Sequence, residues 1–172
     1  VIVSWRRNAD EASPPSIKVS ANYLNSRLAG LEAKRSGANA IILNRDGMVS
    51  EGPGGCLFLC RDEKLVTPTI NDGILESITR DTLITLAADA GVEVQERRIG
   101  RTELHLASEG FYCGTGQELT PINTIDGKPL SDGKPGPITR ILQSAYDDLV
   151  RGRNKKYLHW LTPVWLDESR GG

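Results

Sequence analysis

The sequence predicts a mixed α/β (α+β) fold: a hairpin-rich sheet or pseudo-barrel with flanking helices. Short apolar runs separated by turn pairs such as Asp46-Gly47 and Asp126-Gly127 predict antiparallel hairpins. Three longer stretches carry apolar residues at helical spacing and predict helices. The length of 172 residues suits one domain that buries about 70% of its unfolded surface.

The N-terminal third predicts a loop followed by a helix. Residues 6–16 are polar and contain two prolines, so we expect a loop or linker there. Leucines then recur at helical spacing over residues 22–36, and Gly37 suits the C-terminal cap. Lys18 therefore lies just before a helix, where the chain is fixed and its side chain can project.

The rest of the chain alternates between strands and helices. We expect strands over residues 40–44, 48–51, 56–60, 65–67, 92–99, 111–114 and 119–125. We expect helices over residues 79–90 and 137–150, with a short one over 104–109. Pro137 stands in the favoured first turn of the last helix. The tail holds Tyr157, Trp160 and Trp165, so we expect part of it to pack.

Composition argues against several classes of function. A net charge of -1 argues against a general nucleic-acid binder. No apolar run reaches the about 20 residues that span a bilayer, so we expect no membrane segment. Cys56, Cys60 and Cys113 form no Cys-x-x-Cys pair, and the chain has only two histidines, so we expect no metal site. We expect three reduced thiols in a cytoplasmic protein.

Four segments carry residues that are suited to catalysis or to cofactor binding. They are Ile17–Ser26, Val49–Gly52, Gly73–Asp81 and Gly114–Gly116. The Lys18 amine can form a Schiff base with an aldehyde. The Glu51 carboxylate can pair with a protonated ring nitrogen, and the helix start at Ile78–Thr79 can bind a phosphate. Together these groups predict a site for pyridoxal phosphate.

Each of these residues also has an ordinary structural role. Lysines are usually solvated, a tyrosine such as Tyr23 is often half-buried on a helix, and a carboxylate such as Glu51 often ends a strand in water. Thr79 can simply cap its helix, and Gly-Thr-Gly at 114–116 can be a turn. The order and spacing of all four segments favour the interpretation as a cofactor site.

These segments resemble the fold-type IV (class IV) aminotransferases, and most closely the branched-chain amino acid aminotransferases. The resemblance covers about residues 5–165. It implies that Lys18 is the catalytic Schiff-base lysine, and that Lys18, Tyr23, Glu51, Ile78, Thr79 and Thr115 bind the cofactor. It also implies that Thr115 and Gly116 bind the substrate carboxylate.

The resemblance further implies a domain that this sequence does not contain. Family members carry a smaller N-terminal domain, which supplies an arginine to the cofactor phosphate and part of the substrate pocket. We therefore expect residues 1–16 to be a linker from that domain, and residues 17–172 to be the large cofactor-binding domain. A homodimer, or a second chain that supplies the small domain, is the expected assembly.

The sequence departs from the family pattern at several positions. Glu76-Ser77 replaces the usual Pro-Gly, Cys56 replaces an asparagine, and Gly55 stands where a glutamate is common. Ser108 replaces an aspartate, and Gly116 is the small residue after Gly-Thr. These changes bear on the substrate more than on the cofactor.

The resemblance implies a transaminase that exchanges an amino group between a branched-chain amino acid and a 2-oxo acid such as 2-oxoglutarate. Another class IV enzyme is the close alternative: a D-amino acid or amine transaminase, or an aminodeoxychorismate lyase. A catalytically silent domain that needs a partner chain is an alternative of a different class.

Overall fold

A five-stranded mixed sheet forms the centre of the protein, with β3 (Cys56–Arg61) as its middle strand. In the computed structural model, which describes residues 1–162, the order of the strands is β5-β4-β3-β6-β7. All neighbours in this sheet are antiparallel except β4 and β5. The sheet contains antiparallel hairpins, whereas the turn expected at Asp126-Gly127 joins a separate two-stranded sheet and the one at Asp46-Gly47 is flanked only by an isolated bridge. The mixed α/β prediction is confirmed.

The remaining elements belong to the same described part of the chain, residues 1–162. The other strands are β1 (Ile2–Arg6), β2 (Ile41–Leu43), β4 (Lys64–Thr67), β5 (Val94–Glu96), β6 (Glu109–Gly114), β7 (Glu118–Pro121), β8 (Thr124–Ile125) and β9 (Lys128–Pro129). The α-helices are α1 (Asn22–Lys34), α2 (Ile78–Asp89) and α3 (Pro137–Val150). Three 3-10 helices are η1 (Ile70–Asp72), η2 (Arg101–Leu106) and η3 (Lys155–Trp160).

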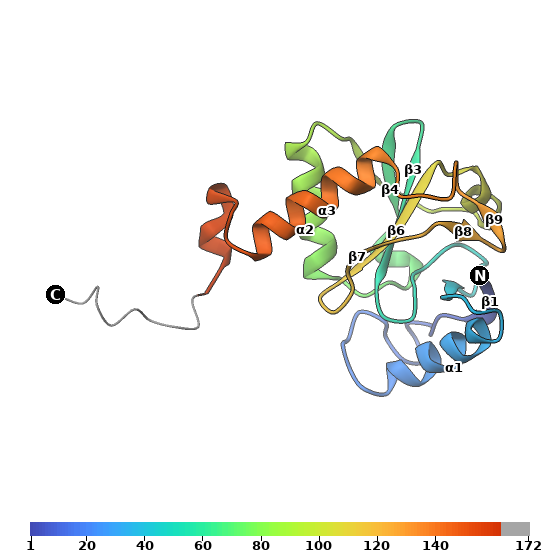
Figure 1. Ribbon diagram of the computed structural model, residues 1–172. Coiled ribbons are helices and arrows are strands. Elements are labelled where there is room, and N and C mark those ends of the chain that lie inside the picture. The colour runs from blue at the N-terminus through green and yellow to red at the C-terminus, as the bar shows by residue number, and fades with distance from the viewer. Residues whose placement is uncertain (163–172) are drawn as a thin grey trace.

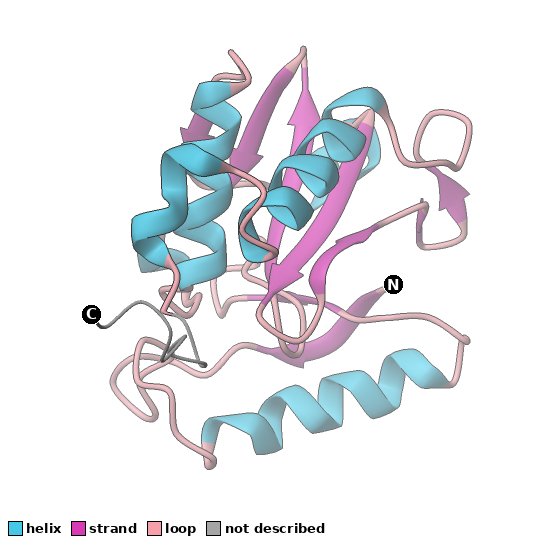
Figure 2. Ribbon diagram, turned by 60° about the vertical axis from the view of Figure 1, so that its left-hand side comes forward, coloured by secondary structure: helices cyan, strands magenta, loops and turns pink. Residues whose placement is uncertain are grey.

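The elements stack in four layers, as Figures 1 and 2 show. Helices α2 and α3 pack together against β6 and β7 on one face of the large sheet. On its other face lies the parallel pair β1–β2, and α1 covers the far side of that pair. Each gap between layers holds its own apolar cluster.

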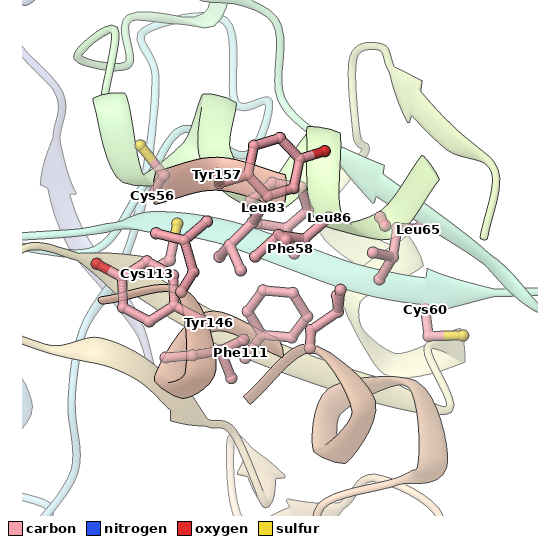
Figure 3. Packing of buried hydrophobic residues seen from close by; sticks show 14 residues of the cluster. Cys56, Phe58, Cys60, Leu65, Leu83, Leu86, Phe111, Cys113, Tyr146 and Tyr157 are labelled. Atoms are coloured by element: carbon pink, nitrogen blue, oxygen red, sulfur yellow. The ribbon is translucent and has the colours of Figure 1, made fainter. Parts of the chain in front are cut away.

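Alternation along β3 explains how one strand serves two clusters, since successive side chains of a strand point to opposite faces. Phe58 faces α2 and α3, where its ring stacks on that of Phe111 at a centroid distance of 5.1 Å. Figure 3 shows this cluster. Leu57 and Leu59 face the β1–β2 pair instead.

A buried carboxylate holds the start of α3. Glu109 on β6 accepts hydrogen bonds from the Ile138 amide at 3.2 Å and the Thr139 amide at 2.8 Å. The first amides of a helix have no acceptor within the helix, so this carboxylate satisfies two of them and complements the helix dipole. Glu109 thereby fixes α3 against the large sheet.

The structure corrects the expectation for residues 1–16. Residues 2–6 form β1, which pairs in parallel with β2, and Val3 is buried between β1–β2 and α1. The outer edge of β1 is also bonded, because the Ile2 amide donates to Asp126 Oδ1 and the Ser4 amide to Glu32 Oε1. The first part of this segment is thus part of the domain.

The bounds of other elements also differ from those expected from the sequence. The run expected as a strand over 92–99 forms a strand only at Val94–Glu96, and the run over 119–125 divides into β7 and β8 after Pro121. Residues 48–51 make only isolated bridges rather than a full strand. In the tail Tyr157 is buried, as expected, whereas Trp165 lies outside the described residues.

Candidate active site

A cavity of about 530 Å³ opens where four distant segments meet. Its walls come from the loop before α1, the glycine-rich loop before β3, the start of α2 and the turn between β6 and β7. The lining includes six of the residues singled out from the sequence: Lys18, Tyr23, Glu51, Ile78, Thr115 and Gly116. The structure therefore brings the four sequence segments to one place.

The side chain of Asn22 holds the loop that carries Lys18. Asn22 is buried at the first position of α1, and its Nδ2 donates to the carbonyls of Pro14 at 2.9 Å and Ile17 at 3.0 Å. Its Oδ1 accepts from Asn8 Nδ2 at 3.0 Å. This network leaves Lys18 exposed at the cavity wall on a backbone that is fixed on both sides.

Glu51 lies at the floor of the cavity and is almost fully buried. Its Oε1 pairs with the Arg7 guanidinium at 2.6 Å, and its Oε2 accepts the Leu75 amide at 3.2 Å. Burial raises the pKa of Glu51 from 4.5 to about 7, although Arg7 and, more weakly, Lys18 oppose the shift. Each carboxylate oxygen has two lone pairs, so a further donor in the cavity can still bind.

The start of α2 presents backbone amides to the cavity. Ser77 caps this 12-residue helix, and its Oγ accepts the Arg80 amide at 3.3 Å. Serine is a favoured cap, so the departure at Ser77 suits the helix start. Among the described residues the Ile78 and Thr79 amides have no hydrogen-bond acceptor, so this end is suited to an anion.

The glycine-rich loop 52–55 packs closely on β6 and its turn. A Cβ atom on Gly55 would lie 2.7 Å from the Cys113 carbonyl oxygen, and one on Gly52 would lie 2.7 Å from the Tyr112 ring. Only glycine permits this approach at both positions. In contrast, a Cβ atom on Gly116 would meet nothing within 4 Å. The wall at Thr115–Gly116 is thus open to the cavity.

Comparisons with known proteins agree with this geometry. The profile of the family described as amino-transferase class IV matches residues 1–125. The chain belongs to this class IV family. The probable branched-chain-amino-acid aminotransferase of Aquifex aeolicus is 46% identical over 166 residues, which cover 95% of this chain and 53% of that protein.

Two solved structures of branched-chain aminotransferases extend the likeness to three dimensions. The branched-chain amino acid aminotransferase from Thermobaculum terrenum in its PLP form superposes with a TM-score of 0.93 at 51% identity, covering 96% of this chain and 54% of that one. The branched-chain aminotransferase from the archaeon Thermoproteus uzoniensis with norvaline gives a TM-score of 0.92 at 45% identity, covering 95% and 55%. The chain spans about half the length of these class IV relatives.

The structure adds residues that the class IV pattern did not reveal. Arg7, in the segment expected to be a linker, is buried; it pairs with Glu51 and donates to the Gly73 carbonyl at 3.0 Å and Ser26 Oγ at 3.2 Å. The run of β-branched and aromatic residues just before Arg7 was the signal that could have placed it at a strand end.

One of the residues predicted to bind the cofactor, Thr79, lies apart from the others. Thr79 is buried on α2 and does not line the cavity, whereas the preceding Ile78 does and is 80% exposed. At this end of α2 the cavity is lined by Ser77 and Ile78 and not by Thr79. A hydroxyl contact from Thr79 to a phosphate stays a prediction.

Two further observations bear on the other expectations. Within residues 1–162 no group of three or more His, Cys, Asp or Glu side chains is arranged to hold a metal ion. In the same part of the chain, no helix is both long and apolar enough to cross a membrane.

Proposed function

We propose that this chain is the cofactor-binding part of a pyridoxal-phosphate transaminase that exchanges an amino group between a branched-chain amino acid and a 2-oxo acid such as 2-oxoglutarate. The observation that carries the proposal is the presence of the Lys18 amine and the buried Glu51 carboxylate in one cavity. Membership of class IV and the names of the relatives support the choice of reaction and substrate class.

The residues of the cavity fit the cofactor. Its volume lies within the about 300–1,000 Å³ of typical small-molecule sites. Lys18 supplies an amine for the aldehyde, Glu51 a carboxylate for the ring nitrogen, and the first turn of α2 amides for the phosphate. When bound, pyridoxal phosphate supplies an electron-withdrawing ring that stabilises negative charge on the substrate carbon.

Lys18 would act first as the covalent anchor and then as the group that moves a proton. In the second role its Nζ takes the proton from the substrate Cα and returns one during the exchange. The loop geometry suits this work, because Asn22 fixes the backbone while the lysine side chain is free to swing.

Glu51 would hold a negative charge beside the ring nitrogen. Arg7 and the Leu75 amide orient the carboxylate, and Arg7 favours its ionised form against the effect of burial. A cationic ring nitrogen in the cavity would favour ionisation further. Thr115 and Gly116 line the open wall of the cavity and would receive the substrate carboxylate.

The rest of the enzyme is also part of the proposal. The relatives are about twice as long, so we infer that a small N-terminal domain, in the same or a second chain, completes the pocket and supplies an arginine to the phosphate. Exposed apolar side chains at the cavity mouth, including Ile17, Tyr23 and Ile78, support such a cover. A homodimer in the cytoplasm is the proposed state, and the three free thiols fit that location.

A labelling experiment tests the cofactor site. The protein is mixed with one equivalent of pyridoxal phosphate, its visible spectrum is recorded, and borohydride then fixes the adduct for peptide mapping. We expect one pyridoxyl group, on Lys18. Lys18→Ala should abolish it, while Lys64→Ala, which removes an exposed lysine paired with Glu93, should not. An adduct spread over other lysines would contradict the assignment.

A second measurement tests the substrate class. The loaded protein, with the small domain supplied if needed, is given leucine, valine, isoleucine or a D-amino acid in turn. We expect the three branched-chain amino acids to yield their 2-oxo acids and the D-amino acid to be inert. A preference for the D-amino acid would point to another class IV enzyme. Binding of the cofactor without turnover of any amino acid would point to a catalytically silent domain.

A further inference from the structure

Two cysteines face each other at the floor of the cavity. Cys56 on β3 and Cys113 on β6 are direct partners across the antiparallel pair, and both line the cavity. Directly opposed residues of antiparallel strands have Cα atoms about 4.5 to 5.5 Å apart. A disulfide spans about 4.4 to 6.8 Å, so the backbone spacing already suits one.

The third cysteine has no such partner. Cys60 lies on the same strand, but Glu109 stands opposite to it. Figure 3 shows Cys56 and Cys113 at one end of the apolar cluster and Cys60 at the other. The chain therefore provides its own internal control, because Cys60 shares the strand and the burial of Cys56 but has no facing thiol.

The Cys56 thiol also belongs to the polar floor of the cavity. Its Sγ donates to the Leu75 carbonyl at 3.5 Å and lies 3.9 Å from Glu51 Oε2. Cys56 is 2% exposed and Cys113 is 0% exposed, so only a small molecule that enters the cavity can reach them. The neighbouring Cys56 and burial raise the pKa of Cys113 well above its usual value, which keeps Cys113 protonated.

We propose that Cys56 and Cys113 form a dithiol site that a small peroxide entering the cavity oxidises to a reversible disulfide. The Cys56 sulfur attacks one peroxide oxygen: an S–O bond forms, the O–O bond breaks, and the other oxygen leaves as water with the thiol proton. The Cys113 sulfur then displaces the hydroxyl on Cys56: the S–S bond forms, the S–O bond breaks, and a second water leaves with the Cys113 proton. Two thiols lose two electrons and one peroxide gains them.

Oxidation changes the floor of the cavity because a disulfide has no S–H group. The Leu75 carbonyl loses its donor, and the thiol beside Glu51 is replaced by a sulfur atom without a proton. The segment between η1 and α2 is then held to β3 by fewer hydrogen bonds. This site goes beyond the proposed transaminase function and does not depend on it, since it needs no cofactor.

Thiol counting without any cofactor tests the proposal. The folded protein is treated with one equivalent of hydrogen peroxide, quenched with catalase, unfolded in guanidinium and alkylated with N-ethylmaleimide. Untreated protein should take three labels, one for each cysteine. We expect the oxidised protein to take a single label, on Cys60, with the Cys56 and Cys113 peptides linked, and dithiothreitol to restore all three.

Variants and a second readout sharpen the test. Cys60→Ser should still lose both remaining labels, whereas Cys113→Ser should form no internal disulfide. Amide hydrogen exchange at residues 75–77 should be faster in the oxidised wild-type protein than in the reduced one. Three labels after treatment, a bond that includes Cys60, or a bond between two chains would overturn the proposal.

Discussion

Replacing Arg7 by methionine would leave the Glu51 carboxylate buried without its cation. The side-chain volume is largely kept, but the 2.6 Å ion pair and the bonds to the Gly73 carbonyl and Ser26 Oγ are lost. Both charged side chains are only 6% exposed, so water cannot replace the missing partner. Removing one member of such a pair costs about 3–5 kcal/mol, a large share of the about 5–15 kcal/mol that stabilises a typical domain.

The pH dependence of this loss has a definite sign. The pKa of Glu51 is raised from 4.5 to about 7, so between these values the folded protein binds more protons than the unfolded chain. The contribution of Glu51 to the free energy of unfolding is therefore fully present below pH 4.5 and falls as pH rises through about 7. The size of this fall is about 3 kcal/mol.

Without Arg7 the pKa of Glu51 rises further, because the largest opposing influence is gone. At pH 5 a proton neutralises Glu51 in both proteins, whereas at pH 8 only the wild type can stabilise the carboxylate. We therefore expect Arg7→Met to lower the free energy of unfolding more at pH 8 than at pH 5. Adding Glu51→Gln should recover part of the loss, since the double variant buries no charge.

Urea denaturation of the unliganded protein at both pH values measures these differences. Arg151→Met is the matched control, because Arg151 pairs with Asp147 at the surface and its side chain is 49% exposed. The control should cost at most about 1 kcal/mol at either pH. An Arg7→Met loss as small as that of the control, or one of equal size at both pH values, would refute the electrostatic account.

Two further substitutions test the packing that frames the cavity, again by urea denaturation. Glu109→Gln removes the charge at the start of α3 and one of its two acceptors, so it should lower the free energy of unfolding by about 1–3 kcal/mol. A variant as stable as the wild type would show that the charge is unimportant. Gly55→Ala places a Cβ atom 2.7 Å from the Cys113 carbonyl and should also cost about 1–3 kcal/mol. Gly116→Ala, which has open space, should change stability by less than about 0.5 kcal/mol, and equal effects at the two glycines would contradict the close approach.

Helices with strong local signals could be predicted from the sequence. The helix expected over residues 137–150 is observed at those bounds, because Pro137 opens it and its apolar stripe packs on the sheet. The start of α2 was also placed to within one residue, where Ser77 provides the cap. In both cases the information lies within one turn of the helix end.

Strand β1 could not be predicted from its local sequence, because its pairing partner lies far along the chain. Its partner β2 begins only at Ile41, and parallel pairing has no tight turn to announce it. The β-prone run at residues 1–5 is short and the polar run after it is longer, so the local sequence predicts a linker over residues 1–16. The break at Pro121 was visible in the sequence, since proline has no amide for a ladder, but its effect on the 119–125 run was missed.

The composition of the site could be predicted in part. Lys18 and Glu51 were found because each stands in a recognisable segment. The Arg7–Glu51 pair was not, because a single arginine in a polar run is usually solvated and only the folded chain shows it buried. The pairing of Cys56 with Cys113 likewise depends on the register of β3 against β6, which neither local sequence encodes.

The four walls of the cavity lie far apart in the chain, which has a consequence for how the protein folds. The residues that line it run from Arg7 to Gly116, and they meet only after β6 has paired with β3. Such non-local pairing is slow, because long loops must close before any contact repays their entropy. A partly folded chain therefore has no cavity. A ligand of this site binds only those protein chains in which the five-stranded sheet has formed. Its presence would raise the melting temperature and shift the folding equilibrium toward the native state by mass action.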